Sequence, residues 1–343
     1  MAAVNTPITR LLGIRTPVVL APMAFASGGA LASEVALAGG FGFIGSGYTT
    51  LENFRSQIAL VRSLLNLPSG PLPIGASFLG WVLDRPESKS VEILHEALNI
   101  GVRAIWLSFG NDLGHWVDVV RSHDQKAGRD SKTLIFIQVN SAEQALTAVR
   151  DWKADVLIAQ GIEAGGHGSA SAPPLLTLIP SVLSVLPHQN PPPLLAAGGV
   201  TNGAQLAACI ALGTAGAVIG TRFLLTPESQ YSDAQKAALI AAKTGDTARS
   251  MVFDILRGTT GWPDGIDGRC LRIPSVQEFE DKVKIEDIQR RFDEGASKGD
   301  PKSMVIWAGT GVGLIDEIKP AKAIVEELHA SLIERLQAAS SLV

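Results

Sequence analysis

The sequence predicts an α/β protein, a (β/α)8 TIM barrel that carries a smaller inserted lid or second domain. Over residues 17–222, short runs of β-branched and other apolar residues alternate with longer stretches of helical periodicity. Eight such units in about 225 residues match the size of this barrel, whereas a doubly wound sheet usually has fewer strands. The composition, with 46% hydrophobic and 18% charged residues and much Gly and Ala, also favours α/β over all-β structure.

The first four strands are expected at residues 17–21, 42–45, 73–78 and 103–109. A helix from Ala30 to Ala38 separates the first two and ends at a Gly-Gly pair, a common stop signal. The next helix is well marked because apolar residues recur on one face: Phe54, Ile58, Val61 and Leu65. A third helix is expected through residues 91–98.

The last four strands are expected at residues 134–139, 155–159, 194–197 and 217–220. Ser141 is placed to cap the helix after strand five, with Glu143 in its first turn. After strand seven, Thr201 and Asn202 open a short helix that ends near Gly213.

The alternation breaks after Arg222. A helix at 233–242 leads into a Gly- and Pro-rich stretch at 257–265 and a strongly charged segment at 278–302. We therefore predict that residues 1–225 and 303–343 form the barrel, and that residues 226–302 form the smaller lid or substrate domain. A final helix should pack back on the barrel through one apolar face: Ile324, Leu328, Leu332 and Leu336.

Charge and cysteine usage exclude several classes of protein. A net charge of −4 without a Lys/Arg run argues against a nucleic-acid partner. The uncharged stretch 18–33 is interrupted by Pro22 and Gly28, so we expect no membrane span. Cys209 and Cys270 have no metal-ligand neighbours, so we expect a reducing, cytoplasmic compartment and no metal. The sequence patterns of dinucleotide-binding folds, P-loops and the common hydrolases do not occur.

Small residues stand where barrel strands seven and eight end, the usual place for a phosphate. Gly198, Gly199, Gly220 and Thr221 would let backbone N–H groups converge on one anion, although paired glycines also occur in ordinary tight turns. Strand one ends in Ala21, Pro22 and Met23. The Met would either offer a polarizable edge to a planar ring or fill a gap in the core.

Polar groups follow strands five and six. Gln138 and Gln160 would direct amides into the same cavity, where they could bind a heterocycle with donors and acceptors. Asp and Glu are scarce at these strand ends, which argues against a two-carboxylate glycosidase and a hard-metal site.

Residues 160–168 are predicted to form a glycine-rich loop at the end of a strand. The loop contains Gly165 and Gly166, and it would present the imidazole of His167 beside exposed backbone N–H groups. The alternative is a tight turn whose histidine only caps a neighbour. The remaining histidines are expected on the solvated surface: His95, His115, His123, His188 and His329.

Five stretches of the chain, taken in order, resemble the nitronate monooxygenases, formerly called 2-nitropropane dioxygenases: residues 21–23, 160–167, 196–200, 220–223 and 307–311. The resemblance covers nearly the whole chain, and the Glu-Ala-Gly-Gly-His loop at 163–167 is its most specific part. It implies an FMN-dependent barrel that oxidises alkyl nitronates with O₂ to carbonyl compounds and nitrite. It also implies that His167 is catalytic and that FMN is contacted by Met23, Gln160, Gly165, Gly199, Gly220 and Thr221.

The chain departs from the family in two places. Many members have Gly-x-Asn at the end of strand three, where this chain has Gly75-Ala76-Ser77, so Ser77 takes the position of one flavin contact. The segment with Trp262, Asp264 and Arg269 matches the family poorly, which leaves the preferred nitronate open.

Two other functions remain as alternatives. A related FMN barrel could take hydride from NAD(P)H and reduce a quinone or an enoyl thioester. The second alternative is a barrel that binds a phosphorylated ligand and catalyses no reaction. The oligomeric state is open, with a homodimer among the candidates.

Overall fold

The computed structural model describes residues 3–128 and 132–342. Within these ranges one sheet is built from eight parallel strands: β1 (Val18–Leu20), β2 (Phe43–Gly45), β3 (Leu72–Leu79), β4 (Val102–Ser108), β5 (Leu134–Val139), β6 (Val156–Gln160), β8 (Leu194–Ala197) and β9 (Gly216–Ile219). Their order is β1-β9-β8-β6-β5-β4-β3-β2. A parallel bridge from Val19 to Phe41 brings the two sheet edges together. The predicted TIM barrel is confirmed.

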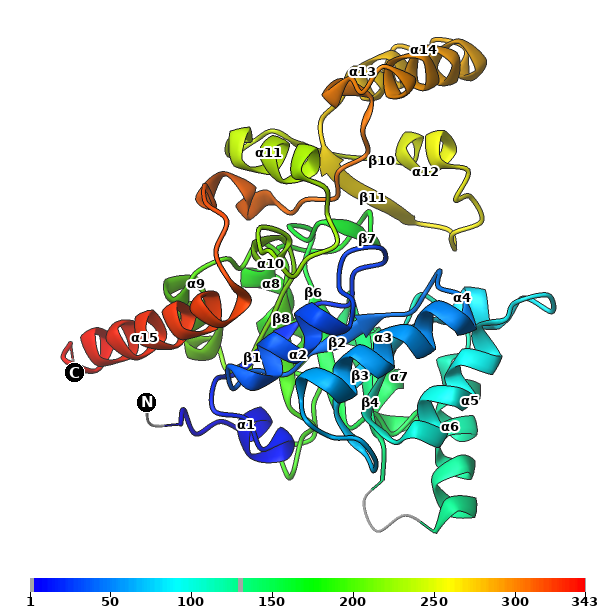
Figure 1. Cartoon of the computed structure of the whole chain (residues 1–343). Helices are drawn as coiled ribbons and strands as arrows, with labels where there is room; N and C mark the ends of the chain where they lie inside the picture. The colour runs from blue at the N-terminus through cyan, green and yellow to red at the C-terminus, as the bar shows by residue number, and fades with distance from the viewer. Residues whose placement is uncertain (1–2, 129–131, 343) are drawn as a thin grey trace.

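Helices follow the strands and cover the outside of the barrel (Figure 1): α2 (Gly29–Leu37), α3 (Leu51–Leu64), α4 (Gly80–Leu83), α5 (Ser90–Ile100), α6 (Leu113–Ala127), α7 (Ala142–Arg150), α8 (Leu175–Leu183) and α9 (Gly203–Ala211). Ser141 caps α7 as predicted, because its side chain accepts a hydrogen bond from the Gln144 N–H. Helix α9, the short helix predicted after the seventh barrel strand (β8), is capped by Asn202. The predicted ends of most elements move by only one or two residues.

Strand side chains alternate between two apolar layers, as the pleat of a strand requires. Val18 and Leu20 face the layer between barrel and helices, whereas Val19 faces the inside. The interior is filled by an aromatic group of Phe41, Phe43, Trp106 and Phe136, whose ring centroids lie 5.2–6.5 Å apart. Ile8 of α1 (Pro7–Leu12) belongs to this inner cluster. The interior of the barrel is therefore a packed core and not an open channel.

A second, antiparallel sheet has the order β10 (Thr247–Ser250), β11 (Ile266–Leu271), β7 (Gly166–Ser169). With α12 (Val252–Arg257), α13 (Pro274–Glu280) and α14 (Ile285–Ser297) it forms a unit that we call the small lobe. Figure 1 shows the small lobe at one end of the barrel. Val252, Phe253, Cys270 and Ile288 are buried in a cluster of its own. The exact domain boundaries stay a prediction.

Strand β7 corrects the expectation that residues 160–168 form only a loop. His167 pairs with Gly268 of β11, so the segment is extended because a partner strand satisfies its backbone. A Gly-His-Gly-Ser strand has no apolar alternation, and its partner lies about a hundred residues later in the chain. Local sequence therefore carried no sign of it.

After the small lobe the chain returns to the barrel. The short helices η1 (Pro301–Ser303) and η2 (Thr310–Leu314) lie along this route, and α15 (Ala321–Ser340) ends it. Helices α10 (Thr221–Leu224) and α11 (Asp233–Ala241) lie on the outward path, between β9 and β10. Helix α15 packs on α9 and α2. No helix of the described ranges is long and apolar enough to span a membrane.

The surface position predicted for His329 is wrong. Its side chain is 0% exposed, and its Nδ1 lies 2.9 Å from the Thr16 hydroxyl oxygen. The buried face of α15 includes Val325 and His329 beside the leucine stripe, so it is wider than the apolar spacing indicated.

Candidate functional site

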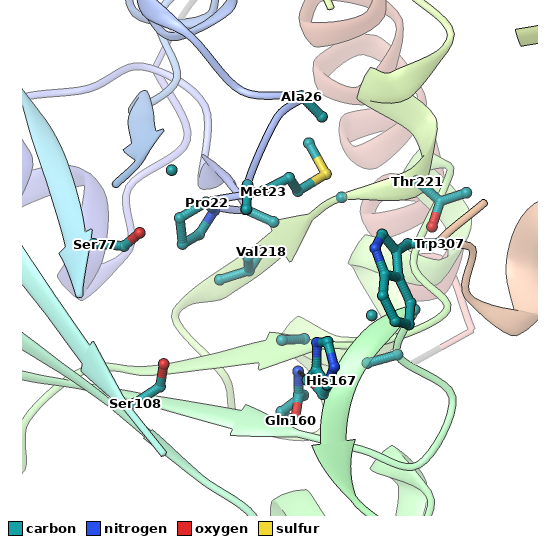
Figure 2. Close-up of a pocket in the computed structure, with 18 of the residues that line it drawn as sticks. Pro22, Met23, Ala26, Ser77, Ser108, Gln160, His167, Val218, Thr221 and Trp307 are labelled. Carbon is teal, nitrogen blue, oxygen red and sulfur yellow. Dashed lines mark hydrogen bonds between the residues drawn. The ribbon is translucent and has the colours of Figure 1, made fainter. Parts of the chain in front are cut away.

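A cavity of about 220 Å³ opens at the carboxyl ends of the barrel strands. Every candidate residue taken from the sequence lines it: Ala21, Pro22, Met23, Ser77, Gln138, Gln160, Gly165, Gly166, His167, Gly198, Gly199, Gly220 and Thr221. Figure 2 shows how residues of distant segments, among them Pro22, His167 and Thr221, surround the same space. They meet because parallel strands in a barrel all end at one mouth.

The turn after β1 forms one wall. The Met23 N–H donates to the Ser27 hydroxyl at 2.7 Å, and the Met23 carbonyl accepts from the Ser27 N–H at 2.9 Å. Gly45 must lack a side chain because a Cβ there would meet the Met23 carbonyl. The Met23 sulfur lies close to Gly220, since a Cβ built on that glycine would be 3.6 Å from it. The thioether therefore stands beside the turn after β9.

The glycine pair after β8 is held by one amide. Gly198 and Gly199 have φ angles of 128° and 67°, which glycine adopts without strain. The Gln205 amide nitrogen donates to the Gly199 carbonyl at 2.9 Å, and its oxygen accepts from the Thr201 N–H at 2.8 Å. The turn is thus fixed before any ligand arrives. Sequence reasoning missed Gln205, which stands in the first turn of α9.

The loop before β7 and the segment 307–311 pack backbone against backbone. A Cβ on Gly165 would overlap the backbone of Ala308 and Gly309. The Thr310 N–H donates to the Glu163 carbonyl at 2.9 Å, and the Gly309 N–H donates to the Thr221 hydroxyl at 3.0 Å. The late Trp-Ala-Gly-x-Gly stretch, found in the sequence only through the resemblance, is therefore part of the cavity wall.

His167 contacts a buried carboxylate. Its Nε2 lies 2.9 and 3.0 Å from the two carboxylate oxygens of Asp254, whose side chain is 0% exposed. The indole of Trp262 stacks on the imidazole, with centroids 3.6 Å apart and planes 11° apart. Trp307 lies on the same ring at 4.7 Å and a tilt of 50°. Sequence reasoning missed Asp254, which is 87 residues away in α12 and stands in no recognisable motif.

The amides at the ends of β5 and β6 bond to each other. The Gln138 amide nitrogen donates to the Gln160 side-chain oxygen at 3.0 Å, and the Gln160 amide nitrogen donates to the His167 carbonyl at 3.1 Å. Asn140 donates to the Gln160 carbonyl at 2.7 Å. Gln160 therefore holds the backbone that carries the imidazole. The Ser77 hydroxyl makes two long contacts: it donates to the Ile44 carbonyl at 3.4 Å and accepts from the Ser46 N–H at 3.4 Å.

Tyr48 and Arg257 add polar character near the mouth, and neither was singled out in the sequence. Within the described ranges the Tyr48 hydroxyl is enclosed without a hydrogen-bond partner. Burial, followed by the negative charge of Asp254, raises the pKa of Tyr48 to about 12, so the hydroxyl stays a donor. The Arg257 guanidinium lies 5.8 Å from the ring centroids of both Phe25 and Trp307.

Comparison with known proteins places this chain in one enzyme family. A family model described as nitronate monooxygenase matches residues 5–76 and 97–331. A nitronate monooxygenase from Neurospora crassa is 32% identical, over 94% of this chain and 91% of the relative.

Two further relatives bear on the chemistry. A (3aS,4S,5R,7aS)-5-hydroxy-7a-methyl-1-oxo-octahydro-1H-indene-4-carboxyl-CoA dehydrogenase from Rhodococcus jostii is 26% identical, over 100% of this chain and 99% of the relative. The structure of a nitroalkane oxidase from Streptomyces ansochromogenes matches with a TM-score of 0.77 and 28% identity, covering 96% of this chain and 99% of that chain.

Proposed function

Because this chain belongs to the nitronate monooxygenase family and is an oxidoreductase, we propose that it binds FMN and oxidises alkyl nitronates with O₂ to carbonyl compounds and nitrite. The observation that carries the proposal is the convergence of glycine turns and one imidazole, His167, on a single cavity at the barrel mouth. A nitroalkane oxidase with the same fold supports it.

The residues of the cavity fit a flavin mononucleotide. A Cβ added at Gly166 would meet no atom within 4 Å, so the backbone there faces open space that a planar group can enter. Gly199, Gly220 and Thr221 would hold the phosphate through backbone N–H groups and the short helix that follows. The ring would lie among Ala21, Pro22, Met23, Ser77, Gln138 and Gln160. When bound, the flavin supplies the electron transfer.

His167 would act on the substrate. In its protonated form the imidazole would hold the nitronate anion, and in its neutral form it could take the α-proton of a neutral nitroalkane. The Tyr48 hydroxyl is a second donor for the nitronate oxygens, since it has no protein partner among the described residues. Trp262 and Trp307 exclude water from the faces of the imidazole.

An absorbance spectrum of the purified protein, followed by addition of a nitronate in air, tests the proposal. We expect a flavin spectrum, FMN in the extract, and nitrite formation. A preparation that stays colourless after incubation with FMN would overturn it.

We expect a His167→Ala variant to retain the flavin and to lose nitronate turnover by about a hundredfold, because the protonated imidazole would hold the nitronate anion and loss of a buried charged partner costs about 2–5 kcal/mol. The matched control is His95→Ala, which removes a solvent-exposed imidazole from α5. Undiminished nitrite formation in His167→Ala would remove this residue from the mechanism.

A second candidate function is suggested by the carboxyl-CoA dehydrogenase relative. In this case the flavin would exchange hydride with NAD(P)H and a quinone or thioester substrate. Anaerobic mixing with NADH distinguishes the two: prompt bleaching of the flavin supports the reductase, and an unchanged spectrum supports the oxygenase. A barrel without catalysis would respond to neither NADH nor a nitronate.

A further inference from the structure

We propose that Asp254 is a positioning residue that keeps the neutral His167 ring protonated on Nε2, so that Nδ1 is the atom that takes the proton of a neutral nitroalkane. The role of the carboxylate as a hydrogen-bond acceptor follows from the structure alone. The proton transfer rests on the function proposed above.

The donors around Asp254 define it as an acceptor. Its Oδ1 accepts from the Thr259 hydroxyl at 2.8 Å and from the Trp262 indole N–H at 3.1 Å. An indole nitrogen can only donate, so the atom facing Trp262 has to be an acceptor. The side chain is fully buried, and both of these contacts come from donors. The His167 Nε2 must then carry a proton and donate the hydrogen bond to the carboxylate.

The other ring nitrogen of His167, Nδ1, has no protein partner among the described residues, and that atom is not enclosed by the protein. The ring itself lines the cavity. Stacking by Trp262 and Trp307 limits rotation of the imidazole, and pairing of His167 with Gly268 fixes its backbone. Nδ1 is therefore the nitrogen that a substrate meets.

The proton transfer balances without a further reactant. The C–H electron pair of the α-carbon becomes the second bond of C=N, and the negative charge moves to the nitro oxygens. The proton forms a bond to the lone pair of the His167 Nδ1. The resulting imidazolium lies against the Asp254 carboxylate, which stabilises its charge. The nitronate so formed is the substrate of the oxidation.

The ring tautomer is tested in the unmodified protein. We expect ¹⁵N NMR of histidine-labelled enzyme at about pH 8.5 to show His167 protonated on Nε2 and bare on Nδ1. The His167→Ala spectrum assigns its signals. A proton on Nδ1, either as the other tautomer or as the imidazolium, would overturn the proposal. This measurement needs no substrate, so its result is independent of whether nitronates are oxidised.

Substitution of Asp254 by Asn keeps the shape and puts a donor in place of one acceptor. The Trp262 N–H keeps the amide oxygen at the Oδ1 position, 2.9 Å from the His167 Nε2, and the amide nitrogen takes the Oδ2 position at 3.0 Å. The side chain then no longer enforces one tautomer, so NMR should show part of His167 protonated on Nδ1. A His167 that stays wholly protonated on Nε2 in Asp254→Asn would contradict the assigned role.

Kinetics separate this role from a structural one. We expect Asp254→Asn to lose kcat/KM on a neutral nitroalkane by on the order of 10²–10⁴-fold, because proton removal depends on the ring tautomer. The loss on the preformed nitronate should be smaller, about tenfold, because the nitronate needs no proton removed and loses only part of the charge that holds it. Asp118→Asn, which removes an exposed carboxylate from α6, is the matched control. Equal losses on both substrates, or a wild-type enzyme inactive on the nitroalkane, would overturn the base role. If neither substrate yields nitrite, the proposed function fails, while the tautomer result still stands.

Discussion

At the scale of single residues, the Tyr48 hydroxyl at the cavity is available to donate a hydrogen bond to a ligand. The Tyr48 oxygen is enclosed and has no partner within the described ranges, although its ring stacks on Phe25 at 6.3 Å. A buried donor without an acceptor is unfavourable unless a ligand or water fills the place. Because burial raises the pKa of Tyr48 to about 12, the proton stays in place throughout the range in which enzymes are assayed.

Tyr48→Phe should lower kcat/KM for a nitronate by about tenfold, since a hydrogen bond to a charged group is lost. Flavin content should not change. The ratio of wild-type to variant activity should stay constant up to about pH 10, because the hydroxyl remains protonated there. Steady-state nitrite assays between neutral and alkaline pH measure this ratio. Equal kcat/KM values for both proteins would assign the hydroxyl no part in binding.

At the scale of elements, β7 joins the barrel mouth to the small lobe. Its neighbouring glycines differ in what surrounds them. A Cβ on Gly165 would overlap the backbone of Ala308 and Gly309, whereas a Cβ on Gly166, which lines the cavity, would meet no atom within 4 Å. The first glycine therefore permits packing of two chain segments, and the second leaves room for the ligand.

Substituting each glycine by Ala should separate stability from flavin binding. Gly165→Ala should destabilise the fold by about 2–3 kcal/mol, because backbone atoms cannot move aside as a side chain can. Gly166→Ala, at a φ of 72°, should cost about 1 kcal/mol and raise the Kd for FMN by roughly tenfold. Thermal unfolding of the flavin-free protein and flavin titration measure the two effects. Equal changes in stability and in the Kd for FMN in both variants would show that the two glycines do not have separate roles.

At the scale of the whole molecule, burial of ionisable groups makes stability depend on pH. Cys209 of α9 is buried against the barrel. Burial, followed by the negative charge of Glu163, raises the pKa of its thiol from 9.0 to about 11. The unfolded chain therefore loses this proton at lower pH than the folded one. The resulting stabilisation is complete below pH 9 and is lost as the pH rises through about 11.

We expect the wild-type protein to lose about 2–3 kcal/mol more stability than Cys209→Ala between pH 8 and pH 11, since two pKa units correspond to that free energy. Urea unfolding at both pH values is the measurement. Ile210→Val, a neighbouring change without a titratable group, should keep the wild-type pH dependence. A Cys209→Ala protein with an unchanged pH dependence would contradict the shift.

Much of the barrel could be predicted from the sequence because apolar runs and helix caps are patterns of neighbouring residues. The stretches at 134–139 and 194–197 were predicted with the bounds that the structure has. The loop expected around His167 is strand β7 because the segment pairs with β11. The pairing was not predicted because β7 has no apolar alternation and β11 lies far along the chain. His329 was misplaced because a buried polar side chain depends on a partner such as Thr16, which lies in another part of the chain.

The sequence by itself determined the barrel and the glycine-lined mouth, since apolar periodicity and strand-end glycines are properties of adjacent residues. Only the tertiary structure decided which groups surround the imidazole. Asp254 reaches His167 from 87 residues away, and Trp262 and Trp307 come from separate segments. A buried carboxylate acquires its role from the donors that fold around it, and no local pattern records where those donors will lie.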